Sequence, residues 1–265
     1  MSRYVVITDL DGTLLDENYS YEDALPTLKL LKMRNVPIVF CSSKTRLEQE
    51  YYRSQLGIKD PFIVENGAAI YLPVNLFNKP CNGRESGEYY LIELGISTTS
   101  ILEKLSPIMD KLNRAVRWLH EMSIEEVMKV TGLPRELAML AVRREYSLVF
   151  KPLDKNNIQS LLVGIEQLGL RWFTGGRLYI INGMHDKGVA VKRLIELYRS
   201  LHEELCIIGV GNSHNDVPFL KIVDVPVLLG SNETVARLIG RDDLVRIDLD
   251  GPKGWSIAVK KALKL

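Results

Sequence analysis

Short hydrophobic runs alternate with amphipathic segments along the first third of the chain. Residues 4–8, 36–41 and 62–64 are rich in β-branched and aromatic side chains, which is typical of buried strands. Residues 22–34 and 46–56 carry hydrophobic side chains near the spacing of an α-helix. Strands and helices that alternate in this way predict a parallel sheet covered by helices.

A different pattern occupies the middle of the chain. Asn, Pro, Gly and charged residues cluster at residues 78–87, and the strands and helices after them no longer alternate regularly. The regular alternation resumes at Lys187. We therefore predict an α/β protein with a doubly wound, mostly parallel sheet. Its core is expected to comprise residues 1–82 and 185–265, with an α+β domain inserted at residues 83–184.

The balance of charged residues argues against polyanionic partners. The 265-residue chain has 34 basic and 33 acidic residues, a formal net charge of +1, and 46% hydrophobic residues. This is the composition of an ordinary globular protein, and its charge gives no electrostatic basis for binding nucleic acid or an anionic membrane. We expect neither as a partner, and the sequence makes no prediction about oligomeric state.

Two features bear on the cellular compartment. The hydrophobic run at the start of the chain is ended at once by carboxylates, unlike a signal peptide, and no run approaches the roughly 18 apolar residues of a membrane span. The three cysteines are widely spaced and match no pattern typical of a zinc site. We therefore expect a cytoplasmic protein with reduced thiols.

Polar side chains follow several of the predicted core strands. They occur in four segments: Asp9 with Asp11, Ser42 with Ser43, Lys187, and Asn212 with Asp216. Each cluster alone would suit a turn. Because ligands of an open parallel sheet bind outside the carboxyl ends of its strands, we expect the four segments to meet in one crevice.

The two carboxylates of Asp9 and Asp11 suggest phosphoryl chemistry. One ionised Asp can attack phosphorus while a protonated neighbour donates a proton to the leaving oxygen. A hard cation such as Mg²⁺ would bind among such oxygen ligands and offset the repulsion between nucleophile and phosphate. Lys187 and the Ser42 hydroxyl would contact the phosphoryl oxygens.

These segments resemble the motifs of the haloacid dehalogenase superfamily. The matching stretches are Asp9-Leu10-Asp11-Gly12-Thr13, the Ser after Val39-Phe40-Cys41, Lys187-Gly188, and Gly211-Asn212-Ser213-His214-Asn215-Asp216. The resemblance implies that Asp9 is the nucleophile and Asp11 the general acid and base. It also implies a magnesium ion held by Asp9, the Asp11 backbone carbonyl, Asn212 and Asp216. The position of the insertion resembles that of a C2-type cap.

A narrower resemblance extends over nearly the whole chain. Residues 42–46, 61–70, 131–134, 143–147 and 175–177 are similar to segments of the mannosyl-3-phosphoglycerate phosphatase family, as are Gly251-Pro252 and Gly254-Trp255. This implies hydrolysis of mannosyl-3-phosphoglycerate to mannosylglycerate, a compatible solute, and phosphate. The alternatives are a glucosyl-3-phosphoglycerate or broader sugar phosphatase, a hexose-phosphate mutase, or a phospho-ligand-binding protein that has lost turnover.

Substrate contacts are expected from both domains. Arg177 follows two glycines that allow close approach, and its planar guanidinium suits the carboxylate of a glycerate group. Lys44 is expected either to contact a phosphate or carboxylate group of the substrate or to be a solvated residue at the start of a helix. Of the adjacent Arg143 and Arg144, one is expected to reach the ligand. The full predicted set is Ser43, Lys44, Asn66, Arg144, Gly176, Arg177 and Asn215.

The chain departs from the family pattern at two positions. Asn212 stands where the family usually has Asp, which removes one negative charge from the metal site and predicts weaker Mg²⁺ binding. Leu148 stands where the family tends to have an acidic residue, which removes a possible polar contact in the cap and leaves the sugar preference open.

Overall fold

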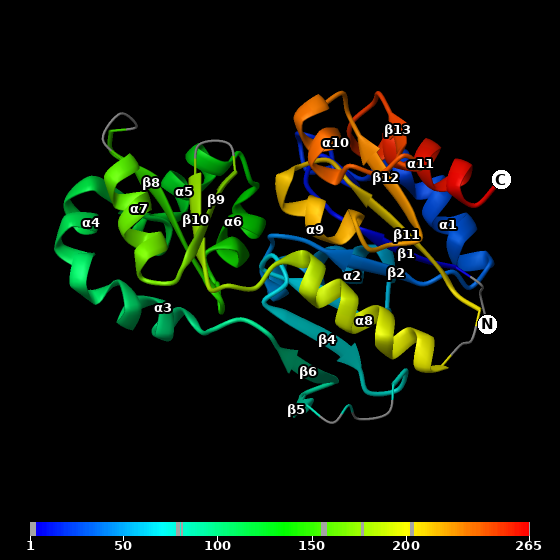
Figure 1. Ribbon diagram of the computed structural model, residues 1–265, viewed down its shortest axis with the longest axis horizontal. Coiled ribbons are helices and arrows are strands. Elements are labelled where there is room, and N and C mark those ends of the chain that lie inside the picture. Colours follow the sequence, from blue (N-terminus) through cyan, green and yellow to red (C-terminus); the bar gives the residue numbers. More distant parts are fainter. Residues whose placement is uncertain are drawn as a thin grey trace.

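The computed structural model describes residues 4–77, 80, 82–154, 158–175, 178–201 and 204–264, which form two lobes (Figure 1). The larger lobe, called the core, contains both ends of the described chain. The smaller lobe, called the cap, comprises residues 98–182. Two linkers, residues 94–97 and 183–186, connect them.

Within the described residues the core is built on one nine-stranded sheet. Its strands are β1 (Tyr4–Thr8), β2 (Ile38–Cys41), β3 (Phe62–Val64), β4 (Ala69–Pro73), β5 (Arg84–Ser86), β6 (Tyr89–Glu93), β11 (Cys206–Gly211), β12 (Val225–Leu229) and β13 (Val245–Ile247). Their order is β13-β12-β11-β1-β2-β3-β4-β6-β5. The strands from β13 to β3 are parallel, whereas β4, β6 and β5 are antiparallel to their neighbours. The predicted doubly wound, mostly parallel sheet is confirmed.

Helices cover both faces of this sheet, so its central strands are buried on both sides. The core helices are α1 (Leu25–Met33), α2 (Arg46–Leu56), α8 (Lys187–Leu201), α9 (Val217–Leu220), α10 (Glu233–Ile239) and α11 (Gly251–Ala262). Val6 of β1 packs on the side of α1, α2 and α11, whereas Val5 and Ile7 pack on the side of α8, α9 and α10. This burial explains why β1 is continuously hydrophobic.

The cap is a four-stranded antiparallel sheet with helices on both faces. Its strands are β7 (Val116–Trp118), β8 (Ser147–Pro152), β9 (Arg171–Gly175) and β10 (Leu178–Asn182), in the order β7-β8-β10-β9. Its helices are α3 (Thr98–Leu105), α4 (Met109–Ala115), α5 (Ile124–Thr131), α6 (Arg135–Ala141) and α7 (Gln159–Gln167). Leu148 and Phe150 pack with α3, α4 and α7, while Val149 joins the hydrophobic cluster of α5, α6 and the core.

The insertion begins later in the chain than the expected residue 83. Strands β5 and β6 form a hairpin that pairs with β4, so residues 84–93 extend the core sheet. Asn82, Gly83 and Gly87 therefore lie at the turns of another core hairpin, since Asn and Gly favour turns in either setting. None of the helices within the described ranges combines the length and hydrophobicity that crossing a bilayer requires.

Candidate active site

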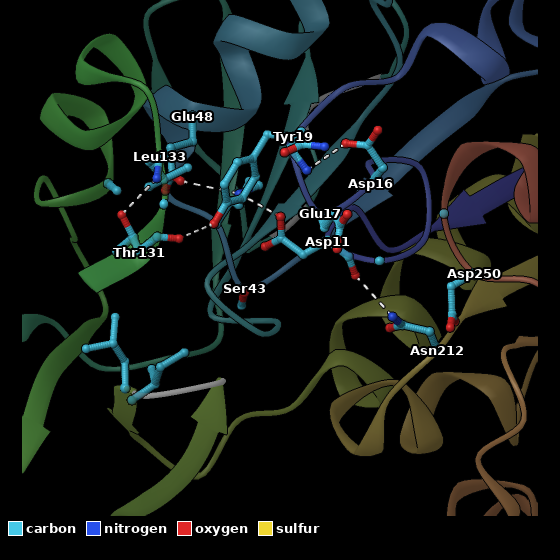
Figure 2. Close-up of a pocket in the computed structure, with 18 of the residues that line it drawn as sticks. Asp11, Asp16, Glu17, Tyr19, Ser43, Glu48, Thr131, Leu133, Asn212 and Asp250 are labelled. Atoms are coloured by element: carbon cyan, nitrogen blue, oxygen red, sulfur yellow. Dashed lines mark hydrogen bonds and ion pairs between the residues drawn. The ribbon is translucent and has the colours of Figure 1, made fainter. Parts of the chain in front are cut away.

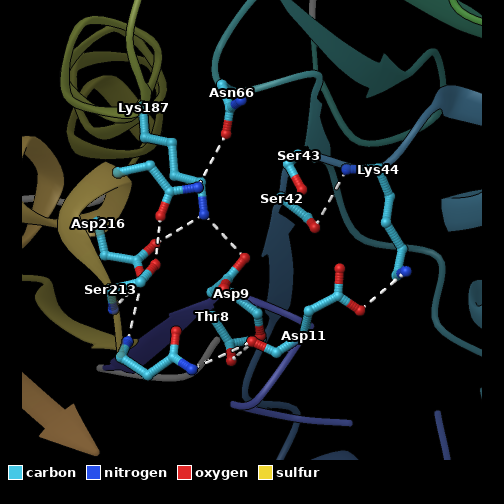
Figure 3. A network of polar contacts seen from close by, with 12 residues as sticks. Thr8, Asp9, Asp11, Ser42, Ser43, Lys44, Asn66, Lys187, Ser213 and Asp216 are labelled. Carbon is cyan, nitrogen blue, oxygen red and sulfur yellow. Dashed lines mark hydrogen bonds and ion pairs between the residues drawn. The ribbon is translucent and has the colours of Figure 1, made fainter. Parts of the chain in front are cut away.

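Side chains from four distant segments lie together at the carboxyl edge of the core sheet (Figure 3). Asp9 follows β1, Ser42 follows β2, and Asn212 follows β11. Lys187 is the first residue of α8, directly after the second linker. The structure thus brings together the polar segments that the sequence placed in one crevice.

Lys187 joins two buried carboxylates. Its Nζ atom is 2.8 Å from Oδ1 of Asp9 and 2.7 Å from Oδ1 of Asp216, and the Lys187 side chain is fully buried. Burial raises the pKa of Asp9 to about 7, the neighbouring Asp216 adds to this rise, and Lys187 opposes it. Burial alone would lower the pKa of Lys187, but Asp216 and Asp9 outweigh it and raise that pKa, so the lysine stays charged.

Asp216 organises the loop after β11. Its second oxygen, Oδ2, accepts hydrogen bonds from the backbone N–H groups of Asn212 and Ser213, both at 2.9 Å, and from the Ser213 hydroxyl. Both oxygens of Asp216 therefore bind protein donors, one from Lys187 and the others from the loop. The assignment of Asp216 as a metal ligand stays a prediction.

Asp11 lies apart from this buried group and faces the cleft. Its side chain is 45% exposed, and its Oδ1 atom is 2.8 Å from Nζ of Lys44, which is itself buried. Lys44 precedes Thr45, the N-cap of α2, and the first turn of that helix is closed by a reciprocal pair of hydrogen bonds between Thr45 and Glu48. Glu48 also approaches Lys44, at 3.6 Å. The start of α2 therefore fixes the ammonium group that holds Asp11.

Asn212 lies where the family resemblance expects a metal ligand. Its amide nitrogen donates to the Asp11 carbonyl at 3.2 Å, and its buried Oδ1 has no hydrogen-bond partner among the described residues. Gly12 permits this approach, since a Cβ there would lie 2.3 Å from that nitrogen. Together with the Asp9 carboxylate, these carbonyl oxygens form the hard donor set that Mg²⁺ prefers, so the residues fit such an ion.

The remaining predicted core residues surround the same space. The Ser42 hydroxyl accepts from the backbone N–H of Lys44 at 3.3 Å. Asn66 is buried, and its Oδ1 accepts from the Asn215 amide at 3.0 Å, while its own amide nitrogen has no partner within the described ranges. Ser43 lines the cleft. These positions supply hydrogen-bond donors around the buried carboxylates.

A cavity of about 1440 Å³ extends from these residues to the cap (Figure 2). Asp11, Ser43 and Asn212 line it from the core, and Thr131 and Leu133 line it from the cap. Arg144 also lines it and donates to the Ser43 carbonyl. Gly176 and Arg177 lie outside the described residues.

Glu65 connects the core to the cap, a role that the sequence did not indicate. Its fully buried carboxylate accepts hydrogen bonds from the backbone N–H groups of Glu145 and Tyr146 and from the Ser147 hydroxyl. It also lies 3.5 Å from Arg144. Burial raises the pKa of Glu65, and Arg144 and these donors oppose the rise.

The second linker packs against the same residue. The carbonyl of Glu65 accepts from the Asn182 amide at 3.4 Å and contacts the His185 ring at 3.2 Å. Burial lowers the pKa of His185, which is 5% exposed. Gly95 of the first linker lies against this ring, since a Cβ there would be 2.8 Å from the histidine Nδ1. Both linkers thus meet at His185.

Comparisons with known proteins agree with this architecture. Residues 6–79 match the family model described as haloacid dehalogenase-like hydrolase. A glucosyl-3-phosphoglycerate/mannosyl-3-phosphoglycerate phosphatase of Methanococcoides burtonii is 39% identical over 261 residues, which cover 97% of this chain and 96% of that protein. A mannosyl-3-phosphoglycerate phosphatase of Pyrococcus furiosus is 39% identical over 226 residues, which cover 85% and 90% of the two chains.

The same fold occurs in solved structures of much lower sequence identity. A haloacid dehalogenase-like hydrolase from B. subtilis has a TM-score of 0.66 at 16% identity, and the match covers 98% of both chains. This likeness supports the arrangement of core and cap.

Proposed function

The chain belongs to the haloacid dehalogenase-like family and is a phosphatase, and we propose that it hydrolyses the phosphate ester of a glycosyl-3-phosphoglycerate. The observation that carries this proposal is the group of Asp9, Lys187 and Asp216 beneath a cavity closed by the cap, with Asp11 at the cavity wall. The near full-length similarity to phosphatases named for such substrates supports the choice of ester.

In the first step, a carboxylate oxygen of Asp9 attacks phosphorus. An Asp9–phosphate bond forms as the bond between phosphorus and the glycerate oxygen breaks, and Asp11 gives its proton to that oxygen. Lys187 stays charged at neutral pH and neutralises phosphoryl charge close to Asp9. An alkoxide is a poor leaving group, so protonation by Asp11 is required for an ester of this kind.

In the second step, water attacks the phosphorus of the aspartyl phosphate. Asp11, now ionised, takes a proton from the water, the Asp9–phosphate bond breaks, and inorganic phosphate leaves. Lys44 keeps the Asp11 carboxylate directed into the cleft during both steps.

Asp9, the Asp11 carbonyl and Asn212 would hold Mg²⁺ in this mechanism. When bound, the ion supplies positive charge that reduces repulsion between the Asp9 carboxylate and the phosphate dianion. The Asn212 Oδ1 atom, which has no hydrogen-bond partner in the part of the chain that the structure describes, supports this assignment, as does the preference of Mg²⁺ for oxygen ligands.

The sugar is proposed to be mannose, with glucose as the alternative. The M. burtonii relative is named for both sugars, and the P. furiosus relative for mannose alone. The cap supplies the contacts that would distinguish them, since the cavity reaches Thr131, Leu133 and Leu178.

A phosphate-release screen tests the proposal. We expect the highest kcat/KM for mannosyl-3-phosphoglycerate or its glucosyl counterpart, compared with 3-phosphoglycerate and mannose 6-phosphate. Equal turnover of simple sugar phosphates would indicate a broader phosphatase instead. Phosphate release without an added bisphosphate activator would exclude a hexose-phosphate mutase. If beryllium fluoride, a phosphate mimic, does not bind to Asp9, the result would favour a phospho-ligand-binding protein without turnover.

A further inference from the structure

Tyr19 crosses the cleft from the core to the cap. It lies in the loop that follows Asp11, and its hydroxyl donates a hydrogen bond to the backbone carbonyl of Thr131 at 2.7 Å (Figure 2). Thr131 is the last residue of α5 and is followed by Gly132, which ends that helix in the left-handed conformation. Both Tyr19 and Thr131 line the cavity.

The backbone of Tyr19 is held in an uncommon conformation. Its φ angle is 61°, in the left-handed region that favours Gly and is unfavourable for an aromatic residue. Asp16 fixes the loop, because its Oδ1 accepts from the N–H groups of Asn18 and Ser20, both at 2.8 Å. Strain of this kind persists where the surrounding structure maintains it, and it occurs often at ligand clamps.

The Tyr19 ring also faces the residue that holds the general acid. Nζ of Lys44 lies 4.9 Å from the centre of the ring and 2.8 Å from Oδ1 of Asp11. A cation close to an aromatic face is stabilised electrostatically. A continuous series of contacts therefore runs from the cap carbonyl of Thr131 through Tyr19 and Lys44 to Asp11.

Other contacts between the lobes lie along α6, where the Thr45 hydroxyl donates to the Leu140 carbonyl at 3.2 Å, and close to the linkers. Glu65 binds residues 145–147 of the cap and also touches Asn182 and His185. A cap that turns about the linkers can keep that contact. The bond between Tyr19 and Thr131 joins elements outside the linkers, so it has to break when the cavity opens.

We propose that Tyr19 is a positioning residue that couples closure of the cap to the placement of Lys44 and Asp11, and so favours substrates large enough to be enclosed by both lobes. The identity of the enclosed substrate rests on the proposed function, whereas the role of Tyr19 in the contact between the lobes does not.

Two measurements on Tyr19→Phe test the coupling, since this change removes the hydroxyl and keeps the ring over Lys44. Amide hydrogen exchange of residues 129–133 and of Asn18 and Ser20 should become about three- to tenfold faster, the effect expected for one lost hydrogen bond. The kcat/KM for mannosyl-3-phosphoglycerate should fall by a similar factor. Turnover of p-nitrophenyl phosphate, which is too small to be enclosed by both lobes, should fall by a smaller factor.

Tyr21→Phe is the matched control, because Tyr21 is a tyrosine of the same loop whose hydroxyl has no hydrogen bond among the described residues. It should alter neither exchange nor turnover.

Unchanged exchange in Tyr19→Phe would overturn the proposal, and so would equal losses for the two substrates. If the unaltered protein releases no phosphate from any glycosyl-3-phosphoglycerate, the proposed function fails, and the exchange result still decides the role of Tyr19.

Discussion

At the scale of single residues, the site depends on one ammonium group between two buried carboxylates. Lys187 compensates Asp9 and Asp216 at once, and Asp9 has a pKa raised to about 7 by burial and by Asp216. A buried charge that is only partly compensated lowers the stability of the fold and raises the reactivity of the charged group, a combination found at catalytic sites.

Asp9→Asn should abolish turnover and stabilise the protein above neutral pH. We expect phosphate release to fall by at least about a thousandfold, since the nucleophile is lost. The raised pKa means that Asp9 favours folding most when protonated, and this contribution disappears as the pH rises through about 7. With Mg²⁺ removed by chelation, the free energy of unfolding of Asp9→Asn should therefore exceed that of the unaltered protein at pH 8 but not at pH 5. Denaturant titrations at both values measure the difference.

Asn212→Asp should bind Mg²⁺ more tightly and be less stable without it. The change adds a negative charge to the metal site but removes the amide that donates to the Asp11 carbonyl. We expect about tenfold tighter binding, equivalent to ~1.4 kcal/mol, in isothermal titration calorimetry. The rise in melting temperature on adding Mg²⁺ should be larger than in the unaltered protein. An unchanged dissociation constant would mean that Asn212 does not contact the ion.

Most individual site residues could be recognised from the sequence because each follows a buried strand. Asp9 and Asn212 stand directly after hydrophobic runs, and Asp216 ends the polar segment that begins at Asn212. Tyr19 and Glu65 could not be recognised as contacts of the cap, since their partners lie 112 and 80 residues away and no local pattern marks them.

At the scale of elements, the turn after β3 controls how the cap is attached. Glu65, Asn66 and Gly67 all have positive φ angles, which reverses the chain between β3 and β4. The same turn directs the Glu65 side chain into the cap loop and its carbonyl to the second linker.

Glu65→Ala and Glu65→Gln should differ in their effect on stability. The alanine variant leaves the N–H groups of Glu145 and Tyr146 buried without an acceptor, at a cost of about 3 kcal/mol. The glutamine variant keeps one acceptor oxygen but turns its NH2 group toward one of the two backbone N–H groups, so its cost should be smaller, about 1–2 kcal/mol. If urea denaturation shows similar losses of unfolding free energy in the two variants, the contact between core and cap depends on the charge of Glu65 and its pairing with Arg144.

His185 should make the linker region sensitive to acid. Burial lowers its pKa below 6.5, so the stability that it contributes is present above that pH and disappears as the pH falls through the lower, folded-state value. The free energy of unfolding of His185→Gln, relative to that of the unaltered protein at the same pH, should therefore rise as the pH is lowered from 7 to 5. Because Asp9 changes stability in the opposite direction, the comparison is best made in the Asp9→Asn background. No relative change would contradict this prediction.

Elements with both faces buried were predicted well, and hairpins at the sheet edge were not. β1 and β3 are continuous hydrophobic runs with the predicted bounds. The residues of β5 are exposed and polar, so only pairing with β6 in space makes them a strand. This is why the insertion was expected to begin at residue 83.

At the scale of the whole molecule, core and cap divide the work of the enzyme. In the proposed mechanism the core supplies the groups close to phosphorus, and both lobes line the cavity that would enclose the rest of the ligand. The order of motifs along the chain predicted a core interrupted by an inserted domain, whereas the contacts that close the cleft could not be predicted because they depend on three-dimensional packing.

The pairing of β1 with β11 also has a consequence for synthesis of the protein in the cell. Tyr4 lies beside Cys206, so the central strand lacks one neighbour until translation has passed that point. At typical translation rates this delay lasts ~10–40 s, whereas the strands of the cap all emerge earlier. A nascent chain would therefore carry a complete cap on an unfinished core, and its first hydrophobic segment would be open to chaperones throughout that interval.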